Sequence, residues 1–224
     1  MSEDIVKTRV WDWTIRAFHW LLVIFVLAMW WTAEQGYMVW HKWLGVGFLS
    51  LLTYRLAWGA IGPNTARLLP LVPRPRALVA YLKTLKPGEH KRPFGHSPLG
   101  GLAVLALLSA LWAQILTGLF AVDVNGLASG WFGHLISFDM GRDLADLHET
   151  IFDVLTVLIV LHLVAITTYG LILRTNLIGP MITGVQTRRE TETAGPSVQV
   201  DWRRFFAALI LSGACAAAIV WLGR

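Results

Sequence analysis

The chain has 224 residues, 55% of them hydrophobic and only 15% charged, and its mean hydropathy is +0.57. A soluble domain of this length would carry more charge and shorter apolar runs, so the composition excludes an ordinary soluble globular protein. Cys215 is the only cysteine, which excludes an internal disulfide and a cysteine-rich metal site. The formal charge of +5 does not indicate nucleic-acid binding, because most of the basic residues crowd a few segments that flank the apolar stretches.

Five apolar stretches approach or exceed the length that a helix needs to cross a hydrocarbon core about 30 Å thick. In chain order they cover residues 17–33, 41–61, 99–122, 148–173 and 204–222. Tryptophan and tyrosine gather near several of their ends, as they do at membrane interfaces. The sequence therefore predicts an all-α integral membrane protein, in which four helices form a bundle and a fifth transmembrane helix follows at the C-terminus.

The first stretch resembles a signal peptide, in that basic residues precede an apolar run. Arg16 directly precedes this stretch, which contains His19 and several aromatic side chains, and this favours a retained first span over a cleaved leader. Retention leaves five spans, and an odd number places the two termini on opposite sides of the membrane.

Basic residues alternate between the connections. They crowd the segment before the first span and the connections 62–96 and 174–204, whereas 34–40 and 123–147 hold a single one, Arg142. Because cytoplasmic connections carry an excess of Lys and Arg, this alternation places the N-terminus in the cytoplasm. We therefore expect a multi-pass protein of the cell inner membrane with a periplasmic C-terminus.

Two connections have distinctive patterns. Residues 75–86 place leucine and valine at helical spacing between Arg and Lys, which predicts a short helix on the cytoplasmic surface, with a solvated loop as the alternative. Residues 187–199 are polar and include a Gly-Pro pair, which indicates a flexible linker. The expected parts of the chain are a membrane domain over 1–174, a cytoplasmic linker over 175–202 and the fifth helix over 203–224.

His148 and His162 lie fourteen residues apart in one apolar stretch. At about 100° per residue, fourteen steps make nearly four whole turns, so both imidazoles face the same way. At about 1.5 Å rise per residue they lie roughly 21 Å apart along the helix axis, one near each membrane face. Ionisable groups at such depth are costly and seldom serve only in packing, so this helix is a candidate ligand for two haems stacked across the membrane.

The predicted topology determines which histidines can meet. His19 starts the first span at the cytoplasmic side, and His41 starts the second span at the outer side. The depth-matched pairs are therefore His19 with His162 and His41 with His148, which predicts two bis-imidazole sites. His96 also lies near the inner face and is the alternative to His19. The remaining histidines, His90 and His134, fall in connections and are expected to be solvated.

Other residues fall into register with these sites. Arg55 follows His41 by fourteen residues and therefore shares its face at the inner level, where a haem propionate would pair with a buried guanidinium. Arg16, one turn from His19, is a second candidate for the inner haem. Gly45 and Gly59 lie one turn beyond His41 and Arg55, where a small residue lets a flat macrocycle approach the backbone.

Four further residues are candidates for supporting roles. The third span has no histidine, and its Gln114, Thr117 and Gly118 are candidates only for hydrogen bonding or packing. Asp153, one turn into the fourth span from His148, is a candidate to orient an imidazole or to reach outer water.

These residues resemble the bacterial cytochrome b561 / nickel-hydrogenase cytochrome b-subunit family over about residues 9–174. The segments that carry the resemblance are RVWDWTIRAFHWLLV, HKWLGVGFLSLLTYRLAWGAIGP, GHSPLGGLAVLALL and LHETIFDVLTVLIVLHLVAI. The resemblance implies a haem-binding four-helix membrane bundle with two non-covalent b haems (heme b). Its implied ligands are His19, His41, His148 and His162. It also implies electron transfer between a membrane quinone and a redox partner, such as a hydrogenase or a c-type cytochrome.

The function predicted from the sequence is that of a diheme b-type transmembrane cytochrome, which relays single electrons between the quinone pool of a respiratory chain and a redox partner. One alternative is a free-standing quinone-linked oxidoreductase, so the sequence leaves open whether the chain is an enzyme or only an electron-transfer subunit. Another is a membrane anchor that docks a peripheral enzyme and has no redox role. A transporter is disfavoured, because no pair of interrupted helices occurs in corresponding halves.

Overall fold

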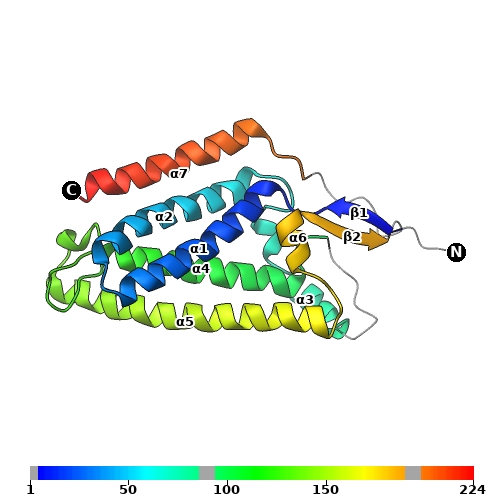
Figure 1. Ribbon diagram of the computed structural model, residues 1–224, viewed down its shortest axis with the longest axis horizontal. Helices are drawn as coiled ribbons and strands as arrows, with labels where there is room; N and C mark the ends of the chain where they lie inside the picture. Colours follow the sequence, from blue (N-terminus) through cyan, green and yellow to red (C-terminus); the bar gives the residue numbers. More distant parts are fainter. Residues whose placement is uncertain (1–4, 86–93, 190–197) are drawn as a thin grey trace. The chain divides into compact units, whose positions relative to one another are not determined.

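The computed structural model describes residues 5–85, 94–189 and 198–224 (Figure 1). His90 and the central part of the predicted flexible linker lie outside the described residues. The helices are α1 Trp13–Glu34, α2 Met38–Ile61, α3 Pro75–Lys83, α4 Pro98–Phe120, α5 Phe138–Leu171, α6 Ile178–Thr183 and α7 Trp202–Leu222. The remaining elements are the strands β1 Ile5–Arg9 and β2 Val185–Arg189 and the 3-10 turns η1 Leu69–Leu71 and η2 Gly133–Leu135.

The described chain is mostly helical, and five of its helices are long and apolar enough to cross a membrane: α1, α2, α4, α5 and α7. They correspond to the five predicted spans, so the predicted fold class is confirmed. The helix expected within residues 75–86 is also present, as α3, and it begins with proline at its first position. Proline suits that position because its missing N–H would have no partner within the helix.

Helix α5 begins at Phe138, well before the predicted start of the fourth span at residue 148. Apolar length reveals only the part of a helix that lipid can cover, whereas α5 starts in a polar segment. Ser137 Oγ accepts a hydrogen bond from the Met140 N–H at 3.3 Å. The loop that precedes α5 is hydrogen-bonded to the first turns of this helix. There, Val122 N–H donates to Gly141 O at 3.0 Å, and Arg142 Nη1 donates to Val122 O at 3.1 Å.

The small sheet and α6 were not predicted from the sequence. β1 pairs with β2 in antiparallel register from Ile5 opposite Arg189 to Arg9 opposite Val185, and Figure 1 shows the two strands side by side with α6 leading into β2. Gly184 links α6 to β2 with φ of +81°, a left-handed conformation that glycine adopts without strain. Its carbonyl accepts hydrogen bonds from the N–H groups of Val10 and Trp11. The predicted linker over 175–202 therefore contains ordered elements, while its boundaries stay a prediction.

The chain forms two compact units. The first unit comprises Met1–Ala17, Trp58–Leu105 and Ile159–Phe205, and the second comprises Phe18–Ala57, Ala106–Leu158 and Phe206–Arg224. Each of the five long helices contributes residues to both units.

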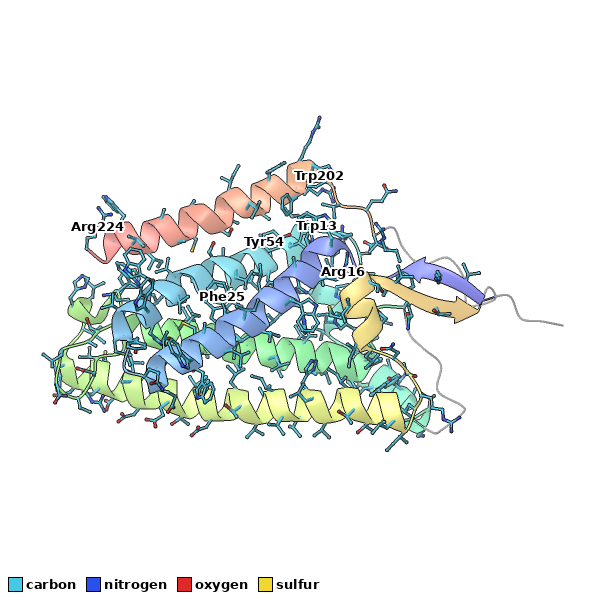
Figure 2. The ribbon with its side chains drawn as sticks, viewed as in Figure 1. Trp13, Arg16, Phe25, Tyr54, Trp202 and Arg224 are labelled. Atoms are coloured by element: carbon cyan, nitrogen blue, oxygen red, sulfur yellow. The ribbon has the colours of Figure 1, made fainter. Side chains whose placement is uncertain are left out.

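An aromatic cluster organises part of the first unit. Trp58 is fully buried, and its ring lies 6.2 Å from that of Phe205 at the start of α7. The ring of Trp13, at the start of α1, lies 6.1 Å from that of Trp202, and Figure 2 labels both side chains. Arg204 Nη1 donates to Ile61 O at 3.1 Å. The start of α7 is thus held against the start of α1 and the C-terminal end of α2.

In the second unit, apolar side chains from α2, α4, α5 and α7 form the core. The most deeply buried are Leu52, Leu111, Leu155 and Ala208, each at most 2% exposed. The rings of Phe25 on α1 and Phe48 on α2 stack at 5.7 Å, and Figure 2 labels Phe25 and Tyr54 in this unit. The shared core brings the second halves of α1 and α4 beside the first halves of α2 and α5.

Asp12 caps α1, and its removal is expected to destabilise the protein. Its Oδ1 accepts hydrogen bonds from the N–H groups of Thr14 at 2.8 Å and Ile15 at 3.0 Å. Because these donors have no partner within the helix, we expect Asp12→Ala to lower the free energy of unfolding by about 1 kcal/mol. Asp12→Asn keeps the cap and serves as the control. Detergent-unfolding titrations measure the difference, and equal midpoints for the two variants would contradict the capping role.

Candidate functional site

His41 on α2 and His148 on α5 face each other within the second unit. Their ring centroids are 6.3 Å apart and their planes lie at 80°. With metal–imidazole bonds of about 2 Å, a metal atom between two imidazoles holds the ring centres roughly 6 Å apart. The two rings therefore have the separation that one metal ion with two axial imidazoles requires.

The His41 ring is oriented by the turn of α1 that lies beside it. Its Nδ1 lies 3.0 Å from Met29 O and 3.3 Å from Thr32 Oγ1. The Thr32 hydroxyl itself donates to the carbonyl oxygens of its own helix, at 2.8 Å to Ala28 and 3.0 Å to Met29. Its oxygen is therefore an acceptor, and the ring nitrogen must supply the proton. This places the proton of a neutral His41 on Nδ1 and leaves the Nε2 lone pair for a metal.

The His148 ring is held in the same manner by α4. Its Nδ1 lies 3.1 Å from Thr117 Oγ1, and it also bonds the backbone of Gln114. The Thr117 hydroxyl donates to the carbonyl oxygens of Ala113 at 2.9 Å and Gln114 at 3.1 Å. Both imidazoles thus bond one threonine and the backbone three residues before it. By the same argument, a neutral His148 carries its proton on Nδ1 and keeps the Nε2 lone pair for a metal.

Gly118 provides the space in which the His148 ring lies. A Cβ added at Gly118 would lie 2.8 Å from His148 Cε1 and 3.1 Å from its Nδ1. No side chain larger than hydrogen fits there unless the ring moves. The expected roles of Thr117 in hydrogen bonding and of Gly118 in packing agree with these contacts.

The two remaining predicted ligands belong to different units. His19 lies in the second unit, where its ring packs edge-on against Trp20 at 5.1 Å. His162 lies in the first unit. Their pairing rests on the sequence spacing and stays a prediction.

Two other histidines, His96 and His134, have surroundings that differ from those of the His41–His148 pair. His96 packs against Trp11 at 4.6 Å within the first unit, so the proposed alternative ligand has an aromatic neighbour. His134 lies in η2 and is exposed, as its predicted position in a connection implies.

The two candidate arginines have different surroundings. Arg55 is only 4% exposed, and its guanidinium carbon lies 5.9 Å from the centre of the Phe18 ring. A guanidinium at this depth needs anionic or aromatic neighbours, as its predicted position beside a propionate supposes. Arg16 Nη1 donates to Ile182 O and so joins α1 to α6, a contact that the sequence did not indicate.

The two candidate glycines and Asp153 lie in three different environments. A Cβ at Gly45 would make an ordinary contact with Met29 Cε at 3.7 Å, so the protein leaves room there. Gly59 is buried, and its carbonyl accepts a hydrogen bond from Leu68 N–H at 3.0 Å. Asp153 lies exposed on α5.

The part of the site that sequence reasoning missed is Thr32. The signal was present, because Ala28-Met29 and Thr32 repeat the spacing of Ala113-Gln114 and Thr117 in another span. Each threonine lies on the span that precedes its histidine, at the same depth in the membrane. This pattern would have identified both Thr32 and Thr117.

A bundle of apolar helices that presents two facing imidazoles, each with Nε2 available, defines a membrane protein of the b-cytochrome class. Residues 10–184 match the model of the family described as prokaryotic cytochrome b561. The chain therefore belongs to the prokaryotic cytochrome b561 family, whose members are membrane b-type cytochromes that bind haem b and take part in electron transfer. No curated protein and no solved structure gave a significant match to the chain. The matched segment includes α1 to α6 and ends before α7.

Gly118→Ala is expected to displace the His148 imidazole. The added methyl group overlaps the ring, and overpacking of this kind costs about 1–3 kcal/mol. We expect the variant to bind less haem, measured as haem per chain by the pyridine haemochrome spectrum. Gly213→Ala on α7 is the control, because an added Cβ there meets nothing within 4 Å. Unchanged haem content in Gly118→Ala would contradict the contact.

Proposed function

We propose that this protein is a diheme b-type cytochrome that relays single electrons across the inner membrane between the quinone pool and a redox partner, a hydrogenase or a c-type cytochrome. The observation that carries the proposal is the facing pair His41 and His148, whose rings are separated as the axial ligands of one iron would be. Family membership supports haem b as the bound group.

The second haem of the proposal lies between His19 and His162. Its support is the fourteen-residue spacing of His148 and His162, which gives α5 one imidazole near each membrane face. Arg55 and Arg16 would neutralise the propionates of this haem, while Gly45 and Gly59 would let the macrocycles approach α2.

Haem b, when bound, would supply a one-electron couple, and two imidazole ligands would leave its iron no open position for oxygen. The residues of the chain would hold the imidazole rings and determine which ring nitrogen is left for the iron. Leu52, Leu111 and Leu155 belong to the buried apolar core of the same unit as the His41–His148 pair. A low dielectric and fixed ligands are the means by which a protein tunes such a couple.

The proposed orientation has a cytoplasmic N-terminus and a periplasmic C-terminus, as the distribution of Lys and Arg supports. His19 and His162 then lie toward the cytoplasm, and His41 and His148 toward the periplasm. The membrane domain over 1–174 carries the haems. The linker over 175–202 leads to the fifth helix, 203–224, which adds no histidine and serves in anchoring or docking.

Removal of one ligand from each pair tests the proposal. We expect the purified protein to contain two low-spin b haems per chain, and His148→Ala and His162→Ala each to contain one, measured by reduced-minus-oxidised spectra and haem quantification. His134→Ala, at an exposed position in η2, is the control and keeps both. Two haems in both ligand variants would refute the assignment. A wild-type protein without haem, from cells that make it freely, would favour an anchor.

Arg55 is expected to raise the potential of the haem beside it. A buried cation stabilises the more negative ferrous state, so Arg55→Leu should lower one of the two midpoint potentials. We expect a shift on the order of 60 mV, which is a tenfold change in a one-electron equilibrium. Arg55→Lys retains the charge and is the control in a spectroscopic redox titration. Equal potentials in the two variants would show that the charge acts on neither haem.

A further inference from the structure

Thr32 and Thr117 differ from other threonines of the long helices in that each contacts an imidazole ring. Both are buried, at 4% and 8% exposure, and both bond an imidazole in addition to their own backbone. Thr150 and Thr156 on α5 are exposed, and each bonds only the carbonyl four residues earlier. The imidazole contact is therefore an addition to the usual behaviour of threonine in a helix.

We propose that Thr32 and Thr117 are positioning residues, which fix the protonated nitrogen and the ring plane of His41 and His148 and hold the two axial imidazoles of one haem nearly perpendicular. The inference rests on the proposed function, because it assumes that these histidines are ligands. It goes beyond the proposed function in two respects. It gives a role to two threonines that are not ligands, and it predicts the angle between the two imidazole planes at the haem.

The direction of the hydrogen bonds supports the first part. Each threonine proton is directed to carbonyls of its own helix, so each threonine oxygen has only lone pairs to offer the ring. The ring must then carry its proton on Nδ1, and Nε2 is left deprotonated toward the iron. An acceptor on Nδ1–H also raises the basicity of the imidazole, which stabilises the ferric state.

The ring planes support the second part. Nδ1 of His41 bonds two acceptors of one α1 turn, and Nδ1 of His148 bonds the equivalent two on α4. A ring that is held on its Nδ1 edge by two acceptors cannot rotate about its Cβ–Cγ bond without losing at least one. The two planes are fixed at 80°, each by a different helix.

Perpendicular ligand planes have a spectroscopic signature. When the two imidazole planes of a ferric bis-imidazole haem are parallel, the low-spin EPR signal is rhombic. When they are perpendicular, the signal becomes strongly axial and its largest g value increases. The wild-type haem at His41 and His148 is therefore expected to give the strongly axial type, identified by its loss in His148→Ala.

The test replaces each threonine by valine, which has the same shape but no hydroxyl. We expect Thr32→Val and Thr117→Val to retain haem, to lower the largest g value of the assigned signal and to raise its midpoint potential, with up to about a tenfold change in the ferrous-to-ferric ratio at fixed potential. Thr32→Ser and Thr117→Ser retain the hydroxyl and are expected to restore both values. Thr156→Val removes a hydroxyl that bonds only its own helix and is the control.

The outcomes separate the two proposals. If His148→Ala retains two haems, the ligand assignment fails and this inference fails with it. If His148→Ala loses one haem but both valine variants keep the wild-type g value and potential, only the positioning role is refuted. A rhombic wild-type signal for the haem that His148→Ala loses would also refute the perpendicular planes. If one valine variant does not accumulate, the other tests the same claim on the opposite ligand.

Discussion

Lipid offers no hydrogen bonds, so each polar group inside a membrane bundle must find its partner within the protein. Here the constraint acts on the imidazoles of His41 and His148, whose Nδ1 atoms are bound to the backbone and to threonines of α1 and α4. Two helix pairs, α1 with α2 and α4 with α5, are thereby joined through polar contacts within the second unit. The same contacts place the ring proton on Nδ1, so the Nε2 lone pair of each imidazole remains available to a metal.

Much of this arrangement follows from the sequence alone, because membrane spans obey few rules. Apolar length located all five long helices, and the order of the spans placed His41 opposite His148. The start of α5 was missed because hydropathy detects only what lipid covers, and Asp12 was missed as a cap because its signal is a single polar residue before Trp13. The pairing of His19 and His162 stays a prediction.

Contacts between side chains that depend on how closely two helices approach each other could not be predicted from the sequence. Gly118 was named only for packing, since no sequence pattern reveals that an added Cβ would meet the His148 ring. Thr32 was overlooked because threonine in a span usually bonds its own backbone and needs no other explanation. The sheet could not be predicted because β1 and β2 have only five residues each and are separated in the sequence by residues 10–184.

That separation has a consequence for biosynthesis. β1 is translated before the long helices, yet its partner begins only at Val185, so this strand must wait while α1, α2, α4 and α5 are made. Contacts between distant chain segments form late, because the intervening loop must close first. The strand pair is therefore the last of these elements to assemble, and its closure marks a chain whose earlier segments have all been translated.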